Sequence, residues 1–289
     1  MKPAAFDYIR PLGLDELLGT LTDGDVLLAG GQSLMPELNE RRRRPRRLVD
    51  LNAVAELERC EAGPDRVVIG ALTRHRDLAE RSDVRAAVPV LSLAARYVGH
   101  AAVRTRGTLG GSIANADPAA ELPGVCVLLD AVARLRSADG ERTTAVADLL
   151  RPGGLAEREV ITAVEMTTLR PGEGWGFREL SRPGAYAFPL VTVGTTLLLD
   201  SGGAVVGLRA AVTGAEAAPY ALPGDAGAGL LGVQPTDAWA AAVADLLAAE
   251  ADPVSDHYAS SAYRRRIVRH LARRAVADAR ERAMRGVPA

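Results

Sequence analysis

The sequence predicts a mixed α/β fold in two parts: an α/β region, followed by a smaller α+β region with an antiparallel sheet and helices. In the first part, a helical leucine pattern leads to an apolar strand at 25–28, which ends in a glycine pair. This order of helix, strand and glycine turn is typical of α/β units. After the stretch 170–174, which contains proline and glycine, the pattern changes to a strand hairpin and then two helices. We therefore expect two domains, 1–172 and 173–289.

Length and composition indicate a globular protein with a substantial core. At 289 residues the chain fits about two domains of roughly 150 residues each. Hydrophobic residues make up 48%, and the net charge of −1 argues against a protein that coats nucleic acid. The start of the sequence lacks the apolar region of a signal peptide, and no apolar run approaches the roughly 20 residues of a membrane span. We expect a cytoplasmic protein.

The elements of the first part follow one another at short intervals. Leucines between 14 and 21 share one face of a helix, and Pro45 ends a helical or irregular segment that begins at Leu34. Thr73 is placed to cap a helix, and Asp139 and Gly140 form a hairpin turn signal. In order, we expect strands at 6–9, 25–28, 47–51, 67–71, 132–136, 143–146 and 160–166, and helices at 14–21, 86–97 and 119–129.

The second part begins with a strand at 175–181. Two longer apolar runs flank the turn residues 200–203 and predict a hairpin. The tail is rich in arginine, but its apolar residues recur at helical spacing, which is typical of a surface helix with one buried stripe. We expect hairpin strands at 190–199 and 204–212 and helices at 237–249 and 260–285.

Two glycine pairs, Gly30-Gly31 and Gly110-Gly111, carry the chemistry of this sequence. Glycine has no Cβ, so backbone N–H groups at such a turn can approach a ligand closely. Successive N–H groups form an anion-binding nest. After the second pair, Asp117 and Pro118 precede a helical pattern whose N-terminus would add a positive dipole end. The pairs therefore predict a phosphate or polyphosphate ligand, long enough to be held at two places.

The segments around the two pairs resemble the paired FAD motifs of a known family. The segments are Ala-Gly-Gly-Gln-Ser-Leu at 29–34 and Thr-Leu-Gly-Gly-Ser-Ile at 108–113, the second followed by Ala-Asp-Pro-Ala-Ala-Glu-Leu-Pro at 116–123. They are similar to the medium, flavin-binding subunit of the xanthine dehydrogenase and CO dehydrogenase family of molybdenum hydroxylases. The likeness covers nearly the whole chain, and residues 259–265 resemble a signature near the C-terminus of the same family.

The resemblance implies a fold for each domain. Residues 1–172 would form the two-subdomain FAD-binding region, of the PCMH type, that is shared with vanillyl-alcohol oxidase-like flavoproteins. Residues 173–289 would form a domain similar to the CO dehydrogenase flavoprotein C-terminal domain.

The resemblance also implies a set of residues that bind FAD. Backbone N–H groups at 29–33 and 110–112 would hold the pyrophosphate, with Thr108 and Ser112 as hydroxyl donors. Glu121 would accept hydrogen bonds from ligand hydroxyls, and Arg178 would stabilise the reduced ring. The full predicted set is Leu27, Leu28, Ala29, Gly30, Gly31, Gln32, Ser33, Leu34, Val98, Thr108, Gly110, Gly111, Ser112, Asn115, Asp117, Glu121, Ile161 and Arg178.

Each of these residues also has a purely structural interpretation. A single glycine pair is often only a turn, and Ser33 and Asp117 can be helix caps. Glu121 can be a first-turn carboxylate favoured by the helix dipole, and Arg178 can be a surface arginine. The apolar members of the set would by default belong to the core. The order and spacing of the whole set favour the cofactor site.

One segment departs from the family pattern. Residues 181–187 resemble a loop that lies over the flavin in the family and carries an acid after its glycine, where this chain has Ala185. The missing carboxylate removes negative charge near the ring and should make reduction easier. The same loop helps to decide whether NAD reaches the flavin, so the electron acceptor stays open.

Cysteine and histidine usage places any metal chemistry on other chains. A [2Fe–2S] cluster normally needs four cysteine ligands, and the chain has only Cys60 and Cys126. The four histidines show no metal-ligand spacing. The resemblance implies two partners, a large subunit that contains molybdopterin and a small 2Fe-2S subunit. We expect no metal site, no nucleic-acid partner and no catalytic residue in this chain.

Two further patterns favour structure over function. The basic run at 41–47 predicts a solvated face, with an acidic partner surface as the alternative. Residues 227–232 fit G-x-G-x-x-G but follow Pro-Gly-Asp instead of a strand, so we do not expect a dinucleotide site there.

Three functions fit these observations. The favoured one is an FAD-dependent oxidoreductase subunit that passes electrons from a partner's iron–sulfur clusters through FAD to an external acceptor. The second is a stand-alone FAD-dependent oxidoreductase that acts on a small molecule. The third is a non-redox binding or interaction module.

Overall fold

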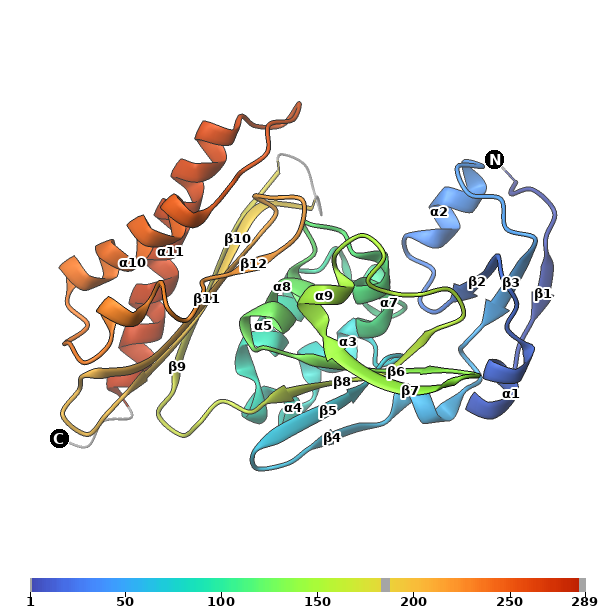
Figure 1. The fold of residues 1–289 in the computed structure, drawn as a ribbon, viewed down its shortest axis with the longest axis horizontal. Helices are drawn as coiled ribbons and strands as arrows, with labels where there is room; N and C mark the ends of the chain where they lie inside the picture. Colours follow the sequence, from blue (N-terminus) through green and yellow to red (C-terminus); the bar gives the residue numbers. More distant parts are fainter. Residues whose placement is uncertain (1, 183–187, 286–289) are drawn as a thin grey trace.

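The computed structural model describes residues 2–182 and 188–285 and has a mixed α/β fold built on three sheets (Figure 1). The N-terminal sheet has the order β1-β3-β2, the central sheet β4-β5-β8-β6-β7 and the C-terminal sheet β12-β11-β10-β9. Along the longest dimension in Figure 1 they follow one another, with the central sheet and its helices between the other two. The predicted fold class is confirmed.

The N-terminal sheet is small and parallel. β3 (Arg47–Asp50) lies between β1 (Asp7–Ile9) and β2 (Asp25–Leu28) and is parallel to both. The sheet is accompanied by α1 (Leu14–Thr20) and α2 (Leu34–Asn39). We expected the strand at 25–28 to be buried, but β2 is only partly buried, because Asp25, Val26 and Leu27 line the cavity described below.

Part of the basic run belongs to this sheet. Arg47 donates from Nε to Asp25 Oδ1 at 2.9 Å, across the register pair that joins β3 to β2. The hydrogen bond with Arg47 lowers the pKa of Asp25 to about 2. At least this arginine is thus a structural residue and not a free surface charge.

The central sheet is antiparallel throughout and is covered by helices. It consists of β4 (Cys60–Ala62), β5 (Arg66–Gly70), β8 (Val160–Thr167), β6 (Val132–Ser137) and β7 (Gly140–Ala145). The accompanying helices are η1 (Ala55–Glu58), α3 (His75–Glu80), α4 (Ser82–Ala87), α5 (Pro89–Tyr97), α6 (Ala101–Arg104), α7 (Leu109–Asn115), α8 (Glu121–Leu128) and α9 (Val146–Leu149).

Three details of these helices differ from expectation. The helix expected at 86–97 is interrupted at Val88, because Pro89 starts α5 as its first residue. The helix expected from Ala119 begins at Glu121. Thr73 caps no helix: α3 begins after Arg74, and the Thr73 hydroxyl is buried without a partner among the described residues.

The C-terminal sheet is antiparallel and is covered on one face by two helices. Its strands are β9 (Gly174–Ser181), β10 (Pro189–Leu199), β11 (Val205–Thr213) and β12 (Tyr220–Ala221), followed by η2 (Ala228–Leu230), α10 (Asp237–Glu250) and α11 (Ser261–Met284). A Cβ on Gly176 would lie 1.9 Å from the Ala275 carbonyl oxygen, so this glycine allows α11 to lie directly on β9. η2 covers part of the G-x-G-x-x-G pattern and follows no strand that would make a dinucleotide fold.

Helix α8 joins the two parts of the molecule. All of its residues are buried, which is typical of a helix that is apolar on every side. It packs on α5 and on the face of β10 and β11 opposite α11 (Figure 1). A Cβ on Gly124 would lie 2.0 Å from Thr213 Oγ1, so α8 and β11 are in close contact.

The connection between β8 and β9, residues 168–173, contains the predicted domain boundary. Among the described residues, no helix has both the length and the apolar character needed to cross a membrane.

Candidate functional site

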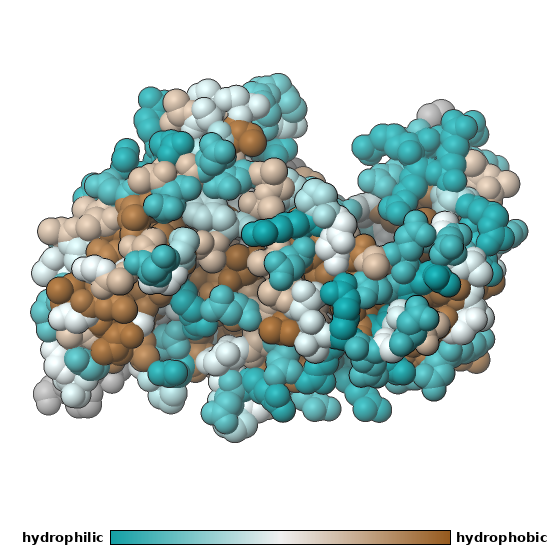
Figure 2. Space-filling model, viewed as in Figure 1, coloured by the Kyte–Doolittle hydropathy of each residue, from teal (hydrophilic) through white to brown (hydrophobic). Residues whose placement is uncertain are grey.

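A long cavity of about 790 Å³ lies between the N-terminal sheet with α2 and the central helices. Its volume is within the range of about 300–1,000 Å³ that is typical of ligand sites. Figure 2 shows the surface hollowed between the part that carries the N-terminal sheet and the rest of the molecule. Most of the wall comes from four segments far apart in sequence: β2 with the following turn, 43–45, 107–122 and 155–161.

The first glycine pair forms an open turn on this wall. Gly31 has a φ of +69°, in the left-handed region that favours glycine, and Ser33 is right-handed. Within the described residues, the amides of Gly30, Gly31, Gln32 and Ser33 donate to no protein acceptor. Consecutive amides without protein acceptors, next to a left-handed glycine, can serve as an anion nest.

Gly30 allows this turn to lie against a second segment. A Cβ on Gly30 would lie 2.2 Å from the Arg106 carbonyl oxygen and 2.8 Å from Gly107 Cα. The Gln32 side chain closes the turn, since its Nε2 donates to the Gly30 carbonyl at 3.1 Å. The turn is therefore held by packing and by one internal hydrogen bond, while its amides stay available to a ligand.

The second glycine pair differs from our expectation. Gly110 and Gly111 are not a turn ahead of a helix but belong to the first turn of α7. The Gly110 amide donates to the Ala71 carbonyl at 2.8 Å, and the Gly111 amide donates to Thr108 Oγ1 at 3.1 Å. The Ser112 amide donates to the Thr108 carbonyl at 3.0 Å. The amides of 110–112, predicted to hold a pyrophosphate, already have acceptors in the protein.

Thr108 and Gly110 both have structural roles at the start of α7. Thr108 is the N-cap of α7, and its hydroxyl oxygen accepts the Gly111 amide, so the expected ligand donor is first a helix cap. A Cβ on Gly110 would lie 2.5 Å from Ala71 Cβ, and the residue therefore allows α7 to approach the end of β5.

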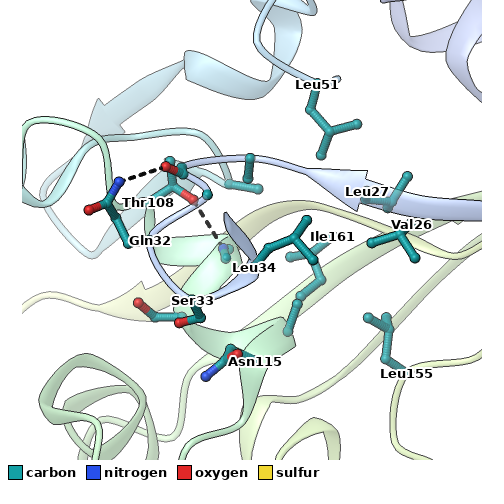
Figure 3. A pocket seen from close by; sticks show the side chains of 18 of the residues that line it. Val26, Leu27, Gln32, Ser33, Leu34, Leu51, Thr108, Asn115, Leu155 and Ile161 are labelled. Carbon is teal, nitrogen blue, oxygen red and sulfur yellow. Dashed lines mark hydrogen bonds between the residues drawn. The ribbon is translucent and has the colours of Figure 1, made fainter. Parts of the chain in front are cut away.

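Polar side chains of the second segment nevertheless reach the cavity. Ser112, Asn115, Asp117 and Glu121 all line it. In Figure 3 the labelled polar side chains Gln32, Ser33, Thr108 and Asn115 lie toward one end of the view, and the labelled apolar ones lie toward the other end. Asp117 also holds the chain before α8, because its Oδ1 accepts the Ala119 amide at 2.8 Å.

Glu121 is the most unusual titratable group of the cavity. Its side chain belongs to a residue only 5% exposed at the start of α8. Burial raises its pKa to about 8, and the nearby charges of Glu179 and Asp117 act in the same direction. At pH 7 the ligand-free carboxyl is therefore mostly protonated, so it can donate a hydrogen bond as well as accept one. The sequence predicted only an acceptor.

All predicted cofactor residues except Leu28 and Arg178 line this cavity. Leu28 packs at the turn, where its Cδ1 would be 3.1 Å from a Cβ on Gly31. Arg178 lies on β9 and makes a two-pronged ion pair with Asp278 of α11, with Nε–Oδ2 at 2.7 Å and Nη2–Oδ1 at 2.8 Å. Its charge is thus committed to a contact within the C-terminal domain.

Sequence reasoning missed several residues of the wall. His75, at the start of α3, is 4% exposed and contacts Ser112. Arg43 and Arg44 line the cavity although their run was assigned to a solvated face, and Val26 and Leu155 add apolar surface. The proximity of β2 to the glycine turn could have indicated Val26; nothing in the spacing of the sequence indicated His75.

Two further expectations concern a metal site and the loop at 181–187. Within residues 2–182 and 188–285, no group of three or more His, Cys, Asp or Glu side chains could hold a metal ion. The loop with Ala185 lies outside the described residues.

Two family models match the chain. Residues 4–167 match the model of the family described as "FAD binding domain in molybdopterin dehydrogenase". Residues 175–279 match the "CO dehydrogenase flavoprotein C-terminal domain".

Similar chains cover almost the full length. The chain is 36% identical to the 6-hydroxypseudooxynicotine dehydrogenase complex subunit alpha of Paenarthrobacter nicotinovorans, over 98% of this chain and 97% of that one. It is 33% identical to the carbon monoxide dehydrogenase medium chain of Hydrogenophaga pseudoflava, over 96% and 97% of the two chains. Among solved structures, quinoline 2-oxidoreductase from Pseudomonas putida 86 has a TM-score of 0.91 at 32% identity, over 98% of this chain and 100% of that chain.

Proposed function

The chain belongs to the family of FAD-binding medium subunits of molybdenum hydroxylases, and we propose that it binds FAD along the cavity with the pyrophosphate at the turn of Gly30–Ser33. The observation that carries this proposal is the run of free amides on the cavity wall. A pyrophosphate needs several donors at close range, and this turn offers them without rearrangement.

The remaining wall fits the other parts of FAD. Leu27, Leu34 and Ile161 offer apolar side chains against which a ring system can pack. Glu121, as a neutral carboxyl, can donate to or accept from ligand hydroxyls without a buried charge. The cavity, the turn and Glu121 together match a long ligand with a charged centre and less polar ends.

We propose the cavity-lining members of the predicted set as the FAD-binding residues. For Leu28 and Arg178 a role in binding stays a prediction, because neither side chain lines the cavity. The division into an FAD-binding domain at 1–172 and a C-terminal domain at 173–289 is part of the same proposal. So is a cytoplasmic location, which fractionation of the source cells would test.

The proposed function is electron transfer within a larger dehydrogenase. When bound, FAD would supply the redox chemistry, since a flavin can take up electrons singly or in pairs and pass them on to an external acceptor. The chain has too few cysteines for an iron–sulfur cluster of its own. We propose that electrons arrive from a small 2Fe-2S subunit, and that a large molybdopterin subunit oxidises the substrate. The relatives named above as a complex subunit and a medium chain support this assembly.

What the chain itself contributes is binding and exclusion of water. The turn at 30–33 fixes the phosphates, and the partly buried β2 and Ile161 shield the ligand's apolar parts. Glu121 holds a proton at its carboxyl at neutral pH. Family membership favours this function over a stand-alone oxidoreductase or a non-redox module.

A visible absorption spectrum of the purified chain, before and after addition of FAD, tests the proposal. We expect flavin bands that correspond to about one cofactor per chain, and FAD rather than FMN as the released molecule. In a co-expressed complex, substrate should bleach these bands only when the two partner subunits are present. A colourless chain that leaves the spectrum of added FAD unchanged would contradict the proposal.

A further inference from the structure

His75 is a buried imidazole at the cavity wall that the proposed function has not used. It starts α3, and its amide donates to the Gly107 carbonyl at 3.0 Å, beside a β-bridge between Arg74 and Thr108. A Cβ on Gly107 would lie 2.6 Å from His75 Nδ1, so the ring packs directly on that glycine.

The two ring nitrogens have different surroundings. Nε2 lies 3.0 Å from Ser112 Oγ, whereas Nδ1 is buried and has no hydrogen-bond partner among the described residues. A proton on Nδ1 would be a buried unsatisfied donor, which costs about 1–3 kcal/mol. A proton on Nε2 can be donated to Ser112 Oγ. The surroundings therefore favour the Nε2–H tautomer.

This tautomer decides what the Ser112 hydroxyl can do. If Oγ accepts from Nε2, the hydroxyl proton cannot go to His75 and is free for another acceptor. Ser112 lines the cavity in the turn of α7 that faces the open glycine turn. A phosphate oxygen is a strong acceptor that would receive this proton.

We propose that His75 is a positioning residue that holds the Ser112 hydroxyl as a hydrogen-bond donor to a phosphate group of the bound dinucleotide. This inference rests on the proposed FAD function. It also gives α7 a part in binding, through a side chain, although its amides at 110–112 are already used.

The charge state of the ring agrees with this role. Burial lowers the pKa of His75 to about 4, the nearby Thr108 backbone opposes that shift, and the charges of Arg74 and Arg104 add to it. The imidazole is therefore neutral at pH 6–8. It contributes one oriented N–H and no net charge toward the phosphates.

A double-mutant cycle on the full-length chain tests the proposal, with FAD affinity measured by quenching of flavin fluorescence. We expect Ser112→Ala to weaken FAD binding about tenfold, since it removes a charge-assisted hydrogen bond. We expect His75→Leu to weaken it by up to the same factor, since it removes the group that orients the Ser112 hydroxyl. The double variant should bind no worse than Ser112→Ala alone, because the two residues act on one contact. His75→Gln, whose amide can still donate to Ser112, should stay within about threefold of the wild type.

Riboflavin has no phosphate, so its affinity distinguishes a lost phosphate contact from a general loss of packing around His75. We expect the same variants to change riboflavin affinity by less than about twofold, because the contact to phosphate does not exist there. Additive losses in the cycle, or an equal loss for riboflavin, would overturn the proposal in favour of a packing role. Ser92→Ala is the matched control. This serine of α5 is buried and donates to the carbonyl of Leu78, which lies in α3 like His75, and it does not line the cavity.

The tautomer itself gives a second readout that does not depend on FAD. Imidazole 15N–1H correlation spectra of the ligand-free chain should show the Nε2–H tautomer for His75, assigned by its disappearance in His75→Gln. An Nδ1–H tautomer would overturn the proposal even if FAD binds. If the wild type binds no FAD at all, the proposed function fails first, and this spectrum still tests the geometry.

Discussion

Gly30-Gly31 and Gly110-Gly111 are the same dipeptide, on the wall of the same cavity, and they do different things. Around the first pair the chain is a turn with a left-handed glycine, and its amides have no protein acceptor in the described part of the chain. Around the second pair the chain is already helical, and its amides donate to Ala71 and Thr108. The difference lies in the neighbours of each pair and not in the glycines.

The comparison shows which feature makes a glycine pair suited to bind a phosphate. A glycine is needed whenever another chain segment comes within reach of its Cα, and that need is common to both pairs. Only the first pair combines such packing with unused donors. The second segment contributes through the side chains that follow its glycines, chiefly Ser112, Asn115 and Glu121.

The largest expected effect is that of Gly30→Ala. The added Cβ would meet the Arg106 carbonyl at 2.2 Å, and neither backbone can yield without moving the turn. We expect the free energy of unfolding to fall by about 2–3 kcal/mol and FAD to be lost from the purified chain. Thermal denaturation and flavin absorbance measure the two effects.

The control for this variant is Gly229→Ala, where a Cβ would have no neighbour within 4 Å. It should change the free energy of unfolding by less than about 0.5 kcal/mol. If Gly30→Ala were as stable as this control and retained FAD, the close approach of the two segments would not be essential.

A pair of variants addresses the comparison directly. Gly31→Ala forces a left-handed alanine, at about 1–2 kcal/mol, and should weaken FAD binding about tenfold because the turn opens. Gly110→Ala crowds Ala71 and should lower the free energy of unfolding by about 1–3 kcal/mol, with FAD affinity of the folded chain within about twofold. Titration with FAD below the melting temperature of each variant measures the affinity, and thermal denaturation measures the loss of stability. If Gly110→Ala weakened FAD binding and Gly31→Ala did not, the phosphate would belong to the second glycine pair instead of the first.

Glu121 predicts a pH dependence of the FAD-free chain. Its folded pKa of about 8 lies above its ordinary value, so the folded state binds the extra proton between these two values. The stabilisation is complete below the ordinary pKa and is lost as the pH rises through 8, at no more than about 1.4 kcal/mol per pH unit. Glu121→Gln should flatten this part of the stability profile, as measured by urea unfolding from pH 5 to 9. An unchanged slope in the variant would assign the pH dependence to other groups.

The smallest effect is expected from Arg178→Ala. Its ion pair with Asp278 is partly exposed, so its loss should lower the free energy of unfolding by no more than about 1 kcal/mol. Because the side chain does not line the cavity, FAD affinity should change less than about twofold. Asp278→Ala is the natural companion variant. A much larger loss of affinity in Arg178→Ala alone would support the predicted role beside the flavin.

Much of the fold could be predicted from the sequence because the local signals are strong. The hairpin of β10 and β11 follows from two apolar runs that flank turn residues, and the helix α11 follows from apolar residues at helical spacing. The break at Pro89 and the start of α8 at Glu121 were missed, since they depend on the conformation of single residues.

Sequence motifs identified most of the residues that line the cavity, but not which of their groups are free to bind a ligand. Whether an amide is free depends on acceptors far away in sequence, such as the Ala71 carbonyl beneath Gly110. Arg178 was expected at the ligand, but its partner Asp278 lies 100 residues further along the chain. His75 reaches Ser112 only because residues 73–75 and 107–109 lie side by side.

The most direct test is the structure of the full-length chain with FAD bound. Our account predicts that pyrophosphate oxygens lie within hydrogen-bonding distance, about 3 Å, of the amides of the turn at 30–33. It also predicts that the Gly110 and Gly111 amides keep their bonds to Ala71 and Thr108. A pyrophosphate held by the amides of α7, with those bonds broken and the first turn empty, would contradict the account.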